Sequence, residues 1–201
     1  LERETGGRRF DDVRDAGHDL WNAGLGRIRI EGGTDDQQRT FYSTLYRTML
    51  FPRIFYETDS AENIVHYSPY NGKVLPGRLF TDNGFWDTFR AAMPLITLLY
   101  PGMSSHIMEG LVNAYMESGW LPEWASPGHR NCMIGSNSAS LIADAYLKGI
   151  RGYDIDTLWS ALVKNTLGHG PVHSVGRYGA EYYNRLGYVP YDAGIKENVA
   201  R

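Results

Sequence analysis

The sequence has almost no cysteine and no long apolar run, and these absences exclude several classes of protein. Cys132 is the single cysteine, so the chain cannot form an internal disulfide and its cysteine usage does not report a redox compartment. No apolar run approaches the roughly 20 residues that a membrane-spanning helix needs, and the first ten residues lack the apolar core of a signal peptide. We therefore expect a soluble chain. Because it does not begin with Met, we expect a processed form or an excerpt.

The chain also has no excess of positive charge and no histidine motif for zinc. Its 20 Lys and Arg against 23 Asp and Glu give a formal charge of −3, which offers no electrostatic reason to expect nucleic acid or an anionic membrane. His169 and His173 have the i, i+4 spacing of helical zinc ligands, but Gly170 and Pro171 between them disfavour a helix. We therefore expect neither a nucleic-acid partner nor a protein zinc site.

What the sequence does have is a globular composition rich in aromatic residues. Its 201 residues suit one substantial domain or a large part of one, and no fixed-period repeat or low-complexity tract is visible. Aromatic residues make up 13% of the chain, with 14 Tyr and 5 Trp. Tyr and Trp combine flat apolar faces with a polar handle, which suits sugars. A Tyr-rich core would explain the same composition.

Apolar spacing and capping residues predict a series of helices. Residues 14–30 predict a connector helix or strand, and Thr34 with Gln37 forms a capping box for a helix that ends at Pro52. Further helices are predicted over residues 85–100, with a possible kink at Pro94, and over 104–118, 136–150 and 156–167. Pro101 and Gly102 are expected to end the helix at 85–100.

Residues 53–80 show a different pattern, with short β-type runs separated by Pro and Gly, which predicts an irregular hairpin excursion. Successive helices with little strand between them favour an all-α fold, either a bundle or a closed αα barrel. The pattern alone does not choose between these two. The tail, residues 178–201, is rich in Tyr and Gly and carries no stop signal.

Residues 82–90 form the densest polar and aromatic cluster. Helix N-terminal N–H groups and Arg90 could hold Asp87 ionised beside Trp86, an arrangement that suits the hydroxyl pairs of a sugar. Spacing alone favours the alternative that Asp87 pairs with Arg90 at i, i+3 and that Trp86 fills the core. In that alternative Asp82 caps the helix, although Asn83 could also do so.

Residues 117–131 form a second cluster, which contains two Trp, two Glu, a His and an Arg on one irregular loop. Large aromatic side chains on a loop are hard to explain by packing alone, so Glu123 and Trp124 are candidate binding residues. The alternative is a loop tucked under a neighbouring element with Trp120 and Trp124 buried.

Several ordered blocks resemble those of the bacterial α-mannosidases of glycoside hydrolase family 92, from about Trp21 to the end of the chain. These blocks are WNAGLGRIRI, TDDQQRTFYSTLYRTMLFPR, GFWDTFRAAMPLITLLYP, GWLPEWASPG, NCMIGSNSASLIADAYLKG and YNRLGYVPYD. The resemblance implies an N-terminal β-sandwich followed by an (α/α)6 barrel, which removes mannose with inversion and uses bound calcium. Residues 1–33 would then be a connector, and residues 34–201 the first part of the barrel.

The resemblance also carries over particular residues. Asp87 matches a family Asp that contacts the sugar in the cleaved-residue subsite, and Trp86 and Arg90 would support it. Glu123 and Trp124 match a block near the same cavity. The family's acid, base and most calcium ligands lie in motifs C-terminal to these blocks, so no catalytic or metal-binding residue is expected in this chain.

The sequence departs from the family at Ser136 and Asn137, where a His is expected after Met-Ile-Gly, so the role of that position does not transfer. The resemblance implies a periplasmic or extracellular location. Two other functions stay open: a carbohydrate-binding or scaffold module without catalysis, and an αα-barrel hydrolase or lyase acting on another sugar.

Overall fold

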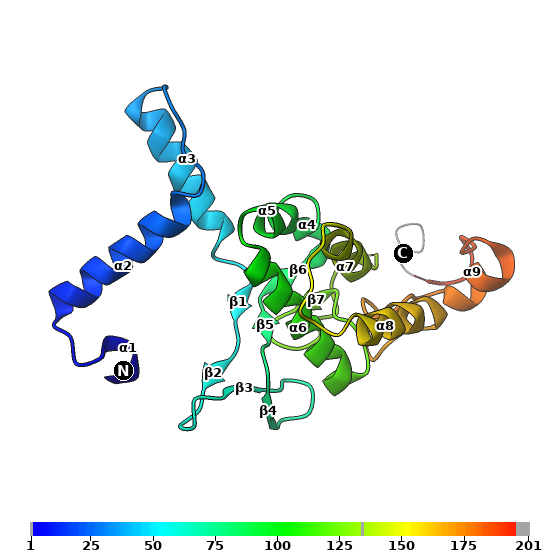
Figure 1. Ribbon diagram of the computed structural model, residues 1–201. Helices are drawn as coiled ribbons and strands as arrows, with labels where there is room; N and C mark the ends of the chain where they lie inside the picture. Colours follow the sequence, from blue (N-terminus) through cyan, green and yellow to red (C-terminus); the bar gives the residue numbers. More distant parts are fainter. Residues whose placement is uncertain (1, 134, 196–201) are drawn as a thin grey trace. The chain divides into compact units, whose positions relative to one another are not determined.

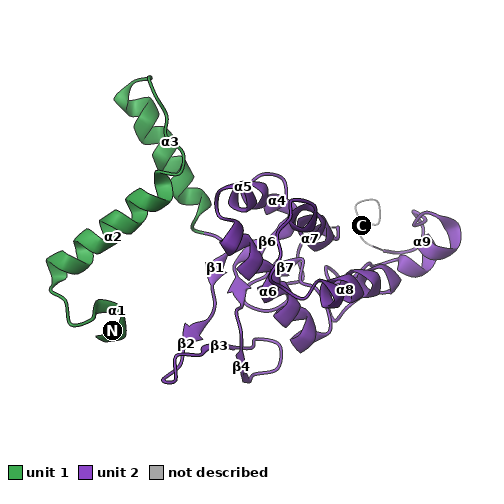
Figure 2. Cartoon of the chain, in the orientation of Figure 1, with its two compact units in different colours: residues 1–50 green, residues 51–201 purple. Residues whose placement is uncertain are grey.

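The computed structural model describes residues 2–133 and 135–195, which form two compact units. The first unit comprises residues 1–50 and the second residues 51–201 (Figures 1 and 2). Residues 34–50, the predicted start of the barrel, therefore belong to the first unit. Where the catalytic domain begins stays a prediction.

The first unit contains three helices, α1 (Glu2–Thr5), α2 (Phe10–Leu25) and α3 (Asp35–Thr48). The predicted connector is a helix rather than a strand. The capping box before α3 is confirmed, because Gln37 N donates to Thr34 Oγ1 and Gln37 Oε1 accepts from Thr34 N. Helices α2 and α3 meet through Trp21 and Tyr46, whose rings lie edge to face at 4.7 Å.

The predicted excursion at residues 53–80 consists of small antiparallel sheets. The strands β2 (Glu57–Thr58), β3 (Ile64–Tyr67) and β4 (Val74–Pro76) form one sheet in the order β2-β3-β4. The strand β1 (Arg53–Ile54) pairs with β5 (Phe80–Thr81) and closes the base of the excursion. The prediction of a short irregular β excursion is therefore confirmed.

The single helix expected over residues 85–100 is in fact two helices, α4 (Phe85–Thr88) and α5 (Ala92–Leu99). Pro94 explains the break, because its ring would clash with the carbonyl of Arg90 if one helix ran through both. Starting a new helix at Ala92 places Pro94 in the first turn, where its missing N–H costs nothing.

The expected stop at Pro101 is also the start of the next helix, α6 (Pro101–Ser118), because Pro suits the first helical position. Tyr100, with φ −135° and ψ 63°, separates α5 from α6. Gly119 ends α6 in the left-handed conformation at φ 78°, as predicted. The remaining helices are α7 (Asn137–Leu147), α8 (Ile155–Leu167) and α9 (Ala180–Leu186). The sequence did not predict α9.

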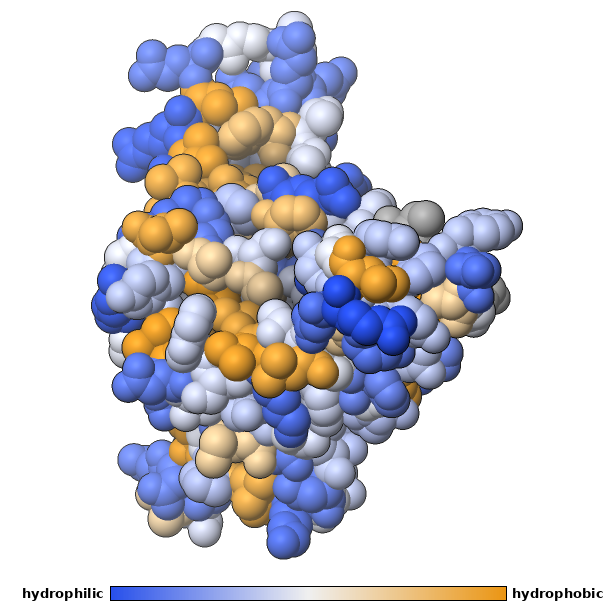
Figure 3. Space-filling view, turned by 90° about the vertical axis from the view of Figure 1, so that its right-hand side faces the viewer, coloured by the Kyte–Doolittle hydropathy of each residue, from blue (hydrophilic) through white to orange (hydrophobic). Residues whose placement is uncertain are grey.

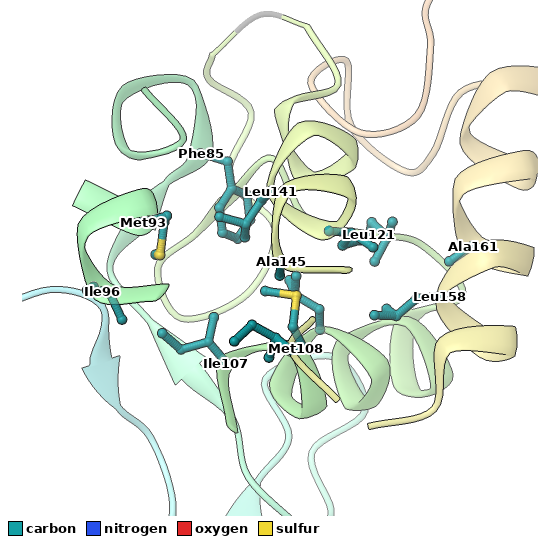
Figure 4. Close-up of a cluster of buried hydrophobic side chains, with 13 residues drawn as sticks. Phe85, Met93, Ile96, Ile107, Met108, Leu121, Leu141, Ala145, Leu158 and Ala161 are labelled. Atoms are coloured by element: carbon teal, nitrogen blue, oxygen red, sulfur yellow. The ribbon is translucent and has the colours of Figure 1, made fainter. Parts of the chain in front are cut away.

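The helices α5, α6, α7 and α8 enclose the hydrophobic core of the second unit, with α6 in contact with the other three. Figure 4 shows the packed side chains, which include Met108 on α6, Leu141 on α7 and Leu158 on α8. The fold is therefore rich in helix with small antiparallel sheets. Within residues 2–133 and 135–195, no helix is both long and apolar enough to cross a membrane.

Candidate functional site

Two short strands bring the two polar and aromatic clusters together. The strand β6 (Asn83–Gly84) pairs antiparallel with β7 (Trp124–Ala125), with Asn83 opposite Ala125 and Gly84 opposite Trp124. The ladder continues into α4, since Phe85 N donates to Glu123 O at 3.1 Å. No local pattern predicts this pairing, because strands of two residues are too short to show an alternation of polar and apolar residues.

Gly84 is required at this point by the indole of Trp124. A Cβ atom at position 84 would lie 2.5 Å from the Trp124 ring, closer than two carbon atoms can approach. The six-membered ring of the indole therefore packs directly against Gly84, and Trp124 is half-buried. This contact places Trp124 against the residue directly before α4, the helix that carries Asp87. That Trp124 belongs to the same cavity as Asp87 stays a prediction.

Asp82 does not cap a helix. Strand β6 separates it from α4, whose N-cap position is Gly84. Instead Asp82 accepts a hydrogen bond from Ser126 Oγ at 2.7 Å, and its other oxygen lies 3.3 Å from Arg53 Nη1. Its backbone has φ 56°, which Asp tolerates better than most residues. Asp82 thus joins the chain before β6 to the loop after β7.

Trp86 and Asp87 lie at the surface on α4, and Trp86 keeps 37% of its area exposed. Arg90 stacks over Trp86, with its Cζ 4.3 Å from the ring centroid, and its Nε donates to Trp86 O at 3.0 Å. In the part of the chain that the structure describes, the Asp87 carboxylate has no ion pair or hydrogen bond. The alternative in which Arg90 pairs with Asp87 and Trp86 fills the core is therefore wrong.

Glu123 is buried, with 1% of its area exposed, and its carboxylate lies at the N-terminus of α7. One oxygen accepts from Asn137 N at 2.7 Å and from Ser138 N at 3.1 Å, and the other from Ser138 Oγ at 2.5 Å. Burial raises the pKa of Glu123 to about 7, although these hydrogen bonds and the charge of Arg177 oppose the rise. Glu123 thus fastens β7 to α7.

Ser136 and Asn137, where the family resemblance leads one to expect a His, lie at the start of α7. Ser136 is the N-cap residue of α7, and Asn137 is its first residue. The backbone N–H of Asn137 binds Glu123, so this position belongs to the join between β7 and α7.

His129 and Tyr70 form a contact that the sequence reasoning missed. The ring of His129 lies 4.8 Å from that of Tyr70, and burial lowers the pKa of His129 to about 4, so it is neutral near pH 7. Tyr70 comes from the excursion, which no local pattern places beside the loop at 117–131.

Trp120 packs away from the two paired strands. The ammonium of Lys164 on α8 lies 4.6 Å from its ring centroid. Of the two aromatic residues of the loop, Trp124 therefore lies beside α4, whereas Trp120 contacts α8.

Across the described residues, no group of three or more His, Cys, Asp and Glu side chains is arranged to hold a metal ion. Calcium binding by the protein stays a prediction.

Comparison with known proteins relates this geometry to a family. The family model of the glycosyl hydrolase family 92 catalytic domain matches residues 1–201. The solved Family GH92 inverting mannosidase BT2199 from Bacteroides thetaiotaomicron is 54% identical, with a TM-score of 0.90 over 95% of this chain and 26% of that chain. The GH92 α-mannosidase BT3965 from the same organism is 26% identical, with a TM-score of 0.80 over 94% of this chain and 25% of that chain.

A curated relative, an uncharacterized secreted glycosidase of Arthroderma benhamiae, is 29% identical over 186 residues, which are 90% of this chain and 20% of the relative. The chain therefore spans about a quarter or less of the length of these proteins. It belongs to glycosyl hydrolase family 92 and represents part of that family's catalytic domain.

Proposed function

We propose that the protein to which this chain belongs hydrolyses terminal α-linked mannose from glycans with inversion, and that it prefers α-1,2 linkages. Residues 1–201 would supply part of the sugar-binding wall. Supporting this, the solved relative at 54% identity is described as an inverting mannosidase, and a second solved relative as an α-mannosidase.

The observation that carries the proposal is the exposed pair formed by Trp86 and Asp87. A carboxylate without a protein partner can accept hydrogen bonds from two sugar hydroxyls, and an adjacent indole can pack against the apolar face of the ring. Arg90 covers one face of Trp86 and restrains the ring. Asp87 is therefore the proposed ligand of the mannose hydroxyls, and Trp86 and Arg90 are its supports.

Glu123 and Trp124 hold this surface in place in the proposed site. Trp124 pairs with Gly84 directly before α4, and the Glu123 carboxylate is occupied by three donors from α7. We propose that Glu123 acts as a positioning residue. Trp124, which is half-buried beside β6, is the one of the two that can still offer an edge to substrate.

The rest of the machinery is proposed to lie outside these residues. Inversion needs a general acid and a general base about 6.5–9.5 Å apart, which leaves room for a water molecule. We propose that both belong to a later part of an (α/α)6 barrel, which packs against an N-terminal β-sandwich. Calcium is a hard cation and would polarise the mannose hydroxyls. Its own protein ligands would be oxygen atoms outside residues 1–201. A periplasmic or extracellular location fits the relative described as secreted.

The test is mannose release from α-1,2-mannobiose by the full-length protein, with calcium and with a chelator. We expect calcium-dependent release, with β-mannose as the first anomer seen by NMR. α-Mannose as the first product would contradict inversion. Profiling other α-linked disaccharides in parallel would identify an αα-barrel hydrolase for another sugar.

A carbohydrate-binding module without catalysis is the second candidate, because Trp86 and Trp124 are each partly exposed and no catalytic acid and base pair is assigned among the described residues. Binding of mannobiose by calorimetry, together with no release from the folded full-length protein under either condition, would favour this candidate.

A further inference from the structure

A small cavity lies behind the strand that precedes Trp86 and Asp87. Its volume is about 20 Å³, and its walls are mainly apolar. The lining residues include Tyr70, Phe80, Asn83, Phe85, Gly110 and Pro122, which come from β5, β6, α4, α6 and two loops. A cavity needs roughly 10–15 Å³ to hold one water molecule, so this one has room for a water and for nothing much larger.

Asn83 brings an unpartnered amide to this cavity. The residue is buried, with 4% of its area exposed, and its backbone pairs with Ala125 in the β6–β7 ladder. Neither Oδ1 nor Nδ2 has a hydrogen-bond partner among residues 2–133 and 135–195. A buried amide is costly when it makes no hydrogen bond, and native proteins seldom leave one without a protein or water partner.

Tyr70 is the second polar group on the wall. Burial and the nearby charge of Glu117 raise the pKa of the Tyr70 hydroxyl well above its usual range, so the group stays a neutral O–H donor and acceptor. The Asn83 amide and the Tyr70 hydroxyl together offer three donor hydrogen atoms and two acceptor oxygen atoms. A buried water typically makes two to four such bonds.

We propose that this cavity binds one ordered water molecule, held by the Asn83 amide and the Tyr70 hydroxyl. The water would satisfy the Asn83 side chain and fix it against the excursion. It would thereby tie β6, which leads directly into Trp86 and Asp87, to the loop that carries Tyr70. The lining residues include no carboxylate, so a cation is not the expected occupant. This inference does not depend on the proposed hydrolase activity.

A crystal structure of the full-length protein at high resolution tests the proposal directly. We expect one density peak within hydrogen-bond distance of the Asn83 amide and the Tyr70 hydroxyl. A cavity without density, or an Asn83 amide bonded to a protein atom instead, would overturn the proposal. In the Tyr70→Phe variant, which keeps the ring against His129, the peak should weaken or disappear.

A stability comparison gives a second, independent readout. If the amide is satisfied by water, Asn83→Leu removes those bonds and should lower the Tm by several degrees. If the cavity is dry, the same change removes an unpartnered amide and fills space, so the Tm should rise. A Tm that stays the same or rises in Asn83→Leu would therefore count against the proposal.

Discussion

His66 Nε2 lies 2.7 Å from Glu117 Oε1, although the two residues are 51 positions apart. Both side chains are almost fully buried, at 0% and 7% exposure. The other ring nitrogen of His66 donates to the carbonyl oxygen of Gly77 at 2.8 Å, so a proton must also lie between Nε2 and the carboxyl group. This contact fastens β3 of the excursion to the last turn of α6.

Removing His66 should therefore destabilise the protein strongly. His66→Leu leaves the Glu117 carboxylate buried without its partner, and breaking a buried pair in this way costs about 3–5 kcal/mol. Chemical denaturation of the full-length protein would measure the loss. The double variant His66→Leu with Glu117→Leu should recover part of it, because the unpaired charge is then gone. A double variant no more stable than His66→Leu would show that the pair does not act as a unit.

Glu123 should make stability depend on pH. Its folded pKa of about 7 lies above the ordinary value of 4.5, so the folded state holds the proton more tightly than the unfolded state does. The stability from this group is complete below pH 4.5 and is lost as the pH rises through 7. Relative to Glu123→Gln, the free energy of unfolding of the wild type should fall by at most about 3 kcal/mol between pH 4.5 and pH 7.

Denaturation of both proteins at several pH values between 4.5 and 8 checks this sign. The exposed Glu31→Gln variant is the control and should differ from the wild type by the same amount at every pH. The opposite result is a wild type that becomes more stable relative to Glu123→Gln as the pH rises. It would mean that the three donors from α7 lower the pKa of Glu123 by more than burial raises it.

Arg90 should affect substrate binding through Trp86. Arg90→Ala removes the guanidinium from the indole face, a contact worth about 0.5–2 kcal/mol, so KM for an α-mannoside should rise about 2- to 30-fold. Arg151→Ala is the matched control, because Arg151 stacks over Tyr146 at 4.0 Å and also donates to its backbone carbonyl. Equal effects of the two variants on KM would place Arg90 outside the site.

Asp87 should matter for activity and not for folding. Its side chain is exposed and makes no ion pair within the described residues, so Asp87→Ala should leave the Tm unchanged. Losing a hydrogen bond between a charged group and the sugar costs about 3 kcal/mol, which corresponds to roughly a hundredfold fall in kcat/KM. Steady-state kinetics on mannobiose, with the exposed Asp192→Ala as control, would measure this. Unchanged kinetics would remove Asp87 from the site.

The sequence predicted the helices well where local chemistry decides them. Thr34, Gln37 and Gly119 are capping signals that act within one turn, and the structure confirms all three. Prolines were harder to interpret, because Pro94 and Pro101 each interrupt the expected helical run and also occupy an early position in a new helix.

The candidate site could be predicted only in part, because its arrangement depends on contacts between distant segments. Both clusters could be recognised from their residue types. Their pairing through β6 and β7, however, depends on the absence of a side chain at Gly84, which leaves room for the Trp124 indole. Glu123 was interpreted as a loop carboxylate, yet its partners begin 14 residues later at Asn137. A capping interaction over such a distance leaves no local pattern.

Residues 1–201 expressed alone should self-associate. The helices of the second unit expose large apolar side chains to solvent, among them Leu147 on α7 at 83% and Trp159 and Leu167 on α8 at 64% and 69%. Figure 3 shows apolar patches on one face of the molecule. Exposed apolar area of this kind favours aggregation or an interface. Light scattering after size exclusion should detect oligomers, and Leu147→Lys with Leu167→Lys should shift them toward monomer. A monomeric, cooperatively melting wild-type chain would contradict the prediction, since it would mean that these faces need no cover.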